Sequence, residues 1–156
     1  MPTQLATTRD FASRFFNETW ELLAQSDRTA DEDVMMVHLA HGSRAHWRVA
    51  GGPKEWAIGE WQIARVYAEL NRAEPAVFHA RQAMALAGGG QLGLFLSASS
   101  HEGLARALVV AGEDDEARKA ADHAAMLLLQ VKDEEERDYI AADLADHARL
   151  IARRSS

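Results

Sequence analysis

The residues with the clearest chemical potential are two histidines three positions apart in the segment VMMVHLAHGSRAHW. In a helix, successive residues are rotated by about 100°, so His38 and His41 share one stripe with Val34 and Ala45. The rest of that stripe is apolar, and we therefore expect it to face the core. A buried imidazole needs a hydrogen-bond partner or a metal, because leaving it unpaired costs about 1–3 kcal/mol.

Two later helical segments carry polar residues on stripes of the same kind. Glu60 shares its stripe with Ile63, and His101 shares its stripe with Leu104. A carboxylate on an apolar stripe is unfavourable unless it is paired. We therefore expect convergence, between three successive helices, of four residues: His38, His41, Glu60 and His101.

Three imidazoles and a carboxylate are suitable ligands for a divalent transition metal such as zinc, iron, copper or manganese. One hypothesis is therefore a small metalloprotein or metal-dependent enzyme, with an open coordination position for water or a small substrate. Glu102 is an alternative ligand to His101. The other hypothesis is a structural polar network in which Glu60 sets the protonation of the histidines. The spacing of His38 and His41 is compatible with both.

The elements that must position these residues are helices throughout the chain, because the apolar residues recur with helical periodicity. Three helix hairpins are predicted over residues 9–50, 54–88 and 94–130, followed by a capping helix over 133–153. Their breaks coincide with Gly51-Gly52-Pro53, with Gly88-Gly89-Gly90 and with Gly112, which suit helix ends. The predicted fold is a single all-α domain over residues 1–156, with about seven helices.

Two segments of the chain repeat each other. Residues 60–86 align with residues 101–127 without a gap. The alignment places Glu60 and His101 at equivalent positions, which we expect to be stacked near each other. The matched residues are Ala64, Arg65, Ala76, Ala80, Ala83 and Leu86 in the first segment, and Ala105, Arg106, Ala117, Ala121, Ala124 and Leu127 in the second.

This repeat resembles the tetratricopeptide family of helical repeats. The family pattern has a small residue, an aromatic residue three positions later, and further small residues twelve and nineteen positions after the first. It is met by Ala64, Tyr67, Ala76 and Ala83, and again by Ala105, Ala117 and Ala124, with Leu108 in place of the aromatic residue. The repeats recur after 40–41 residues instead of about 34. The resemblance implies stacked hairpins, either as an open superhelix or as a compact bundle closed by the last helix.

The resemblance also implies a binding groove. In that family the positions of Arg65 and Arg106 line the concave surface, and Trp61 and Glu102 lie one turn earlier on it. Such a groove would bind a protein, a peptide or a small acidic ligand, through bidentate arginine contacts and stacking. The alternative is that each arginine pairs with a nearby glutamate, such as Glu69 or Glu102.

Charge and composition exclude other classes of function. The net charge of −7 argues against nucleic-acid binding, which normally needs a basic surface. The absence of cysteine excludes disulfides and thiolate metal ligands. No apolar run approaches about 18 residues, and the first residues lack the pattern of a signal peptide. We expect a cytoplasmic protein that does not insert into a membrane.

Two expectations concern the surface. The first helix carries Phe11, Phe15 and Phe16, and the exposed end of a short repeat stack favours self-association, so we expect a homodimer formed through this helix. Three further histidines lie on otherwise polar helix faces and are expected to be solvated: His79, His123 and His147.

Overall fold

This computed structural model describes residues 3–156 of the chain. These residues form seven α-helices joined by short connections. They are α1 (Gln4–Leu23), α2 (Ala30–Ala50), α3 (Pro53–Glu69), α4 (Ala73–Ala87), α5 (Leu94–Ala111), α6 (Asp114–Leu128) and α7 (Glu134–Arg154). Those residues contain no strand, which confirms the all-α class. The first hairpin begins earlier than predicted, at Gln4 instead of residue 9. Among residues 3–156, no helix is both long enough and apolar enough to span a membrane.

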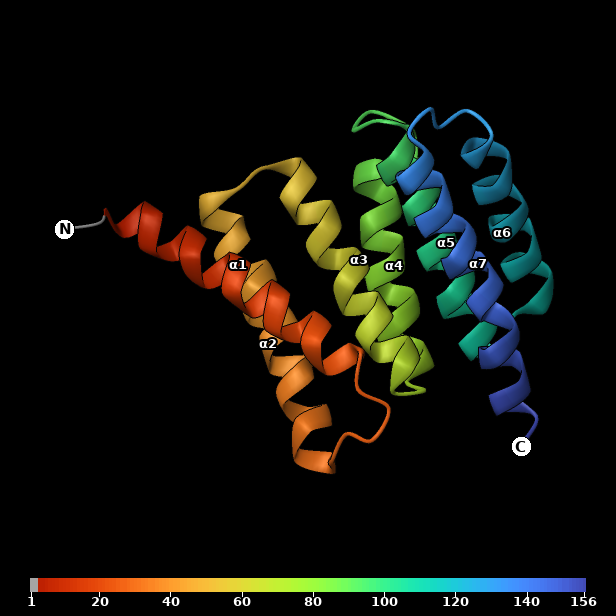
Figure 1. The fold of residues 1–156 in the computed structure, drawn as a ribbon, viewed down its shortest axis with the longest axis horizontal. Helices are drawn as coiled ribbons and strands as arrows, with labels where there is room; N and C mark the ends of the chain where they lie inside the picture. The colour runs from red at the N-terminus through yellow and green to blue at the C-terminus, as the bar shows by residue number, and fades with distance from the viewer. Residues whose placement is uncertain (1–2) are drawn as a thin grey trace.

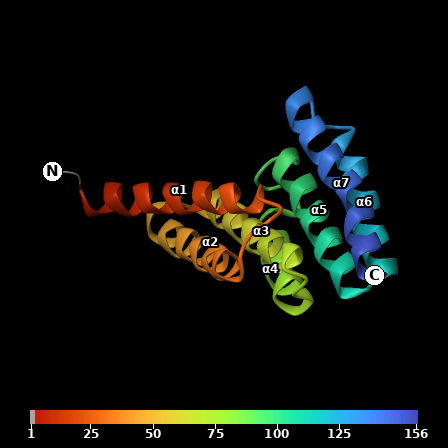
Figure 2. The ribbon, with the colours of Figure 1, turned by 60° about the horizontal axis from the view of Figure 1, so that its bottom comes forward.

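The helices are arranged as three hairpins that follow one another along the chain. Each hairpin pairs consecutive helices, α1 with α2, α3 with α4 and α5 with α6, and each packs against the next (Figure 1). The last helix, α7, lies along α5 and contacts α6, and it closes one end of the stack (Figures 1 and 2). The predicted stack of hairpins with a C-terminal capping helix is confirmed.

Local signals explain where several helices begin and end. Before α2, Thr29 and Glu32 form a reciprocal capping box that satisfies two backbone N–H groups. The side chain of Asp133 accepts a hydrogen bond of 3.0 Å from the Glu136 amide at the start of α7. Helix α5 ends at Gly112, whose φ of 78° lies in the left-handed region that glycine adopts without steric cost.

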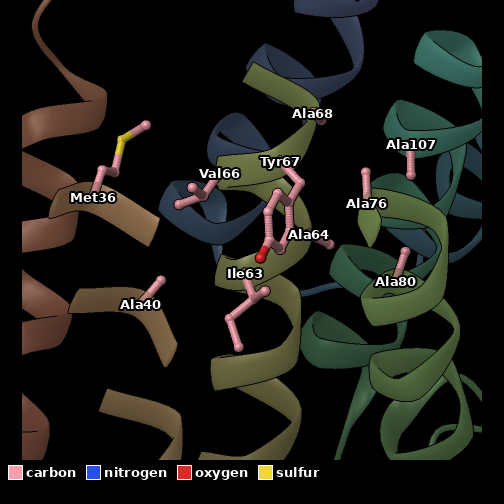
Figure 3. Packing of buried hydrophobic residues seen from close by; sticks show 10 residues of the cluster. All are labelled: Met36, Ala40, Ile63, Ala64, Val66, Tyr67, Ala68, Ala76, Ala80 and Ala107. Atoms are coloured by element: carbon pink, nitrogen blue, oxygen red, sulfur yellow. The ribbon is translucent and has the colours of Figure 1, made fainter. Parts of the chain in front are cut away.

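The core is built from small residues packed around a few larger ones. Tyr67 of α3 lies at the centre of the cluster, with Ala76 and Ala80 of α4 on one side and Met36 of α2 on the other (Figure 3). The alanines that the repeat predicts as seams are buried, with the exception of the half-buried Ala121. Small side chains let neighbouring helices approach closely, so the register of each helix against the next is well defined.

Candidate ligand-binding site

The stripe predicted to face the core on α2 faces outward over much of its length. Val34, His38 and Ala45 are exposed, and only His41 is half-buried. The buried positions of α2 are instead Met36, Ala40 and Ser43. Because both sets of residues have helical spacing, periodicity alone did not identify which of them packs against α1 and α3.

The four predicted metal ligands are not brought together. His41 and Glu60 belong to one polar cluster, His38 lies at the surface, and His101 lies between α5 and α6. The Nε2 atom of His101 is 3.2 Å from the Gly88 carbonyl oxygen, and its ring stacks on His123 with centroids 4.0 Å apart. Within residues 3–156, no group of three or more histidine, aspartate and glutamate side chains is arranged to hold a metal ion.

His41 and Glu60 instead take part in a hydrogen-bonded network between α2, α3 and α4. Glu60 accepts hydrogen bonds from Arg44 Nε at 3.0 Å and from His79 Nδ1 at 2.7 Å. The Nε2 atom of His41 is 2.9 Å from the Tyr67 hydroxyl, and the Tyr67 ring stacks on His79 at 5.9 Å. This arrangement resembles the structural network that is the alternative to a metal site.

The ionisation of this network follows from its contacts. Burial acts to raise the pKa of Glu60, but the hydrogen bond and charge of His79, together with Arg44, hold it below its ordinary value. Burial and the neighbouring His79 lower the pKa of His41, although Glu60 opposes this. His41 is therefore favoured as a neutral imidazole beside an ionised carboxylate.

A second polar network joins α5 to α7 and takes up the arginine expected in the groove. Arg106 is 2% exposed. Its Nε atom donates to Glu102 at 3.0 Å, and its Nη1 and Nη2 atoms donate to the Asp146 carboxylate at 2.8 Å and the Asp143 carbonyl at 3.0 Å. Glu102 also pairs with His147 Nε2 at 2.8 Å. Helix α7 thus occupies this part of the groove.

Arg65, the other arginine expected in the groove, is paired in the same way. Its Nη1 atom donates to Asp143 of α7 at 2.9 Å, and its guanidinium lies over the Trp20 ring at 5.6 Å. The expected glutamate partner is observed for Arg106, whereas Arg65 pairs with Asp143 and not with Glu69. A ligand carboxylate would have to displace Asp143 to reach Arg65 in full, and would have to displace Glu102 and Asp146 to reach Arg106.

The pKa values of the carboxylates in this second network are shifted in opposite directions. Burial acts to raise the pKa of Glu102, but the hydrogen bond from His147 and the charges of Arg106 and Arg65 hold it below its ordinary value. Burial and the charge of Glu102 raise the pKa of Asp143, against the opposing effect of Arg65 and Arg106. Asp146, which binds Arg149 and Arg106, has its pKa held well below its ordinary value by these two arginines, so Glu102 and Asp146 are the carboxylates of the network whose charged form is stabilised.

Two histidines that the sequence places on polar faces are in fact partners of buried carboxylates. His79 binds Glu60, and His147, which is 7% exposed, binds Glu102. Of the three histidines expected to be solvated, only His123 is exposed. Each carboxylate and its histidine lie on different helices, 19 and 45 residues apart in sequence, so no local pattern signals the pairs.

Beside these networks lies an apolar pocket of about 280 Å³ between α1 and α7, with α3 and α5 beneath it. Trp61, predicted as a groove residue, lines it together with residues that the sequence did not single out. Its wall is almost entirely carbon. The lining residues are Phe16, Trp20, Ala57, Ile58, Trp61, Ala87, Phe95, Leu96, Ser99, Ser100 and Tyr139.

Five aromatic rings from four helices form a continuous series along this pocket. In order of contact they are Phe16, Trp20, Trp61, Tyr139 and Phe95. Neighbouring ring centroids are 5.6–6.5 Å apart, and neighbouring ring planes are inclined by 48–77°. Tilted and edge-to-face contacts of this kind are favourable between aromatic rings, so the series holds its own members in place along the pocket.

Two residues that line the pocket, Trp61 and Ser99, carry buried polar atoms without hydrogen-bond partners behind its carbon wall. Trp61 Nε1 and Ser99 Oγ are buried and make no hydrogen bond, and neither does Glu102 Oε2, one turn after Ser99 in α5. Trp61 packs directly on Gly103, where an added Cβ would lie 2.7 Å from its Cδ1 atom. Unsatisfied buried polar atoms are rare in native proteins and often mark a place where water or a ligand binds.

Comparison with protein-family models, with curated proteins and with solved structures finds no match to this chain. The geometry described above is therefore the basis for the functional proposals that follow.

Proposed function

We propose that this chain is a binding module whose ligand inserts an apolar group into the aromatic pocket between α1 and α7. The observation that carries the proposal is the pocket itself, an apolar cavity with aromatic walls between the helices of the stack. Small-molecule and side-chain sites in proteins have this character, with mostly hydrophobic walls and a few polar groups.

The resemblance to tetratricopeptide repeats supports the same surface. Proteins of that family bind their partners in the groove formed by the first helices of successive hairpins, here α1, α3 and α5. Helix α7 fills the part of that groove over α5, through Arg106 and its partners. The part over α3, bordered by Trp20 and Trp61, stays open as the pocket.

The paired arginines favour an apolar group over an acidic one as the recognised feature. Arg65 and Arg106 are both bound to carboxylates of α7, so little of their charge is available to a ligand. The volume of about 280 Å³ suits a fragment-sized molecule or one large side chain of a peptide partner.

The test uses the tryptophan side chains as reporters. Of the four tryptophans, Trp20 and Trp61 line the pocket, whereas Trp47 and Trp56 lie outside it. Titration of ¹⁵N-labelled protein with indole should shift the Trp20 and Trp61 indole N–H signals and leave those of Trp47 and Trp56 in place. Equal shifts of all four signals, or none, would contradict the proposal.

A matched pair of substitutions assigns the binding to this cavity. Ala57→Phe adds a ring to the pocket wall and should abolish the indole shifts. Ala125→Phe makes the same change at an exposed position of α6 and should leave them unaltered. Undiminished indole binding in a folded Ala57→Phe variant would show that the probe binds elsewhere.

A further inference from the structure

The pocket wall is aromatic to a degree that simple apolar binding does not require. The rings of Phe16, Trp20, Trp61, Phe95 and Tyr139 dominate a wall that Leu and Ile would make equally dry. Aromatic rings differ from aliphatic chains because their faces carry a negative electrostatic potential. A cation placed over several faces at once is therefore attracted, most strongly over tryptophan.

The electrostatics around the pocket point in the same direction. No lysine or arginine lines it, and the chain carries a net charge of −7. The unpaired Oε2 atom of Glu102 lies one turn after the lining residue Ser99 in α5. Burial raises the pKa of Tyr139, and the charges of Asp143 and Glu102 act in the same direction, whereas Arg65 and Arg106 oppose them. The lining of the pocket itself therefore places no positive charge against a bound cation.

One of the rings already holds a cation on the side away from the pocket. The guanidinium of Arg65 lies 5.6 Å from the centre of the Trp20 ring. The second hollow along α3, lined by Trp20, Arg65 and Glu69 among others, is charged. Trp20 lines both this charged hollow and the apolar pocket. It therefore separates a charged region of the groove from an apolar, aromatic region.

We infer that the pocket is an aromatic cage for a trimethylammonium group. A primary ammonium group is strongly hydrated and needs hydrogen-bond acceptors, which this almost wholly carbon wall does not offer. A quaternary ammonium group has no N–H to satisfy and presents only methyl groups, while its charge is attracted by the ring faces. This inference rests on the proposed function and specifies the chemical class of the group that the pocket takes.

The decisive experiment compares choline with 3,3-dimethyl-1-butanol, which has the same shape but no charge. Both are titrated into ¹⁵N-labelled protein while the Trp20 and Trp61 indole signals are followed. Choline should bind about tenfold more tightly. If the neutral analogue binds equally or more tightly, the inference of a trimethylammonium cage is contradicted, whereas the proposed binding of an apolar group is not. If neither compound shifts the two signals, the proposed function fails as well.

Substitutions separate the charge effect from the apolar one. Trp20→Leu keeps an apolar wall without the ring, so choline binding should weaken about tenfold while that of the alcohol changes less than about twofold. Tyr139→Leu, at a more exposed position, is a second variant should the first fail to fold. Trp47→Leu, outside the cavity, should change neither. If the Trp20→Leu variant loses affinity for both compounds by the same factor, the inference of a cage is contradicted.

Two peptides identify the source of the group. One carries a single trimethyl-lysine, and the other has the same sequence with unmodified lysine. Tighter binding of the methylated peptide than of choline would indicate a protein ligand, and the reverse would indicate a free small molecule. Equal affinity for the methylated and unmodified peptides would contradict the inference.

Discussion

The α3–α4 and α5–α6 hairpins share one sequence frame but differ in what covers their first helices. Trp61 and Glu102 are equivalent in that frame, as are Arg65 and Arg106. On α3, Trp61 lines the aromatic pocket, and the side chain of Arg65, which lines the neighbouring charged hollow, is 18% exposed. On α5 the equivalent positions lie beneath α7, where the side chains of Arg106 and Glu102 are 2% and 1% exposed.

The difference shows how one added helix changes the role of a repeat position. Beneath α7, a charged side chain must have its partners within the protein, and Arg106 has three on Glu102, Asp146 and the Asp143 carbonyl. Beside the pocket, Trp61 keeps an unpaired N–H and faces an empty volume. The covered half of the groove therefore serves stability, whereas the open half is the part in which we propose that a ligand binds.

The largest expected effect comes from the same substitution at the two equivalent arginines. Arg106→Met leaves Glu102 and Asp146 without their main partner in a buried site, and should lower the free energy of unfolding by about 3–5 kcal/mol. Arg65→Met removes one partly exposed ion pair and should cost about 1 kcal/mol or less. Urea denaturation followed by circular dichroism measures both. Equal costs would mean that α7 does not bury the two positions differently.

A smaller effect is expected from the network on the other side of α3. Glu60→Gln keeps the shape of the side chain but removes the charge that binds Arg44 and His79, and should cost about 1–2 kcal/mol near neutral pH. Since the folded-state pKa of Glu60 lies below its ordinary value of 4.5, its stabilisation is present above pH 4.5 and is lost as the pH falls through the folded-state pKa. The deficit of the variant should therefore shrink in acid.

Glu74 on α4 provides the matched control for this change. It is exposed and forms no ion pair within residues 3–156. Glu74→Gln should change the free energy of unfolding by less than about 0.5 kcal/mol at any pH. A similar loss in the two variants would show that the contacts of Glu60 do not contribute.

The smallest effect is expected at His101, the repeat equivalent of Glu60. Burial and the neighbouring His123 lower the pKa of His101 below its ordinary value of 6.5, although the Gly88 carbonyl opposes this. Below pH 6.5 the unfolded chain therefore binds more protons at this position than the folded chain. The free energy of unfolding consequently decreases as the pH is lowered. His101→Gln keeps a donor for the carbonyl, costs less than about 1 kcal/mol at pH 8, and should flatten this acid dependence. An unchanged slope would exclude His101 as its source.

Much of the fold was predictable because its signals are local. The glycine breaks, the cap at Asp133 and the alanines of the repeat all act through neighbours within one helix or hairpin. The network partners were not predictable, because His79 and His147 lie 19 and 45 residues from their carboxylates. On α2, two sets of residues have helical spacing, and only packing against α1 and α3 decides that Met36 is buried and His38 exposed.

By itself, the sequence determined seven helices, their pairing into hairpins and the equivalence of Arg65 with Arg106, because periodicity, capping and small-residue spacing act over short stretches of chain. Only the tertiary structure decided that α7 covers α5 and leaves α3 open, and that five aromatic residues from four helices meet around one cavity. The physical reason is that burial and charge pairing depend on which surfaces meet, and those surfaces come from helices distant in sequence.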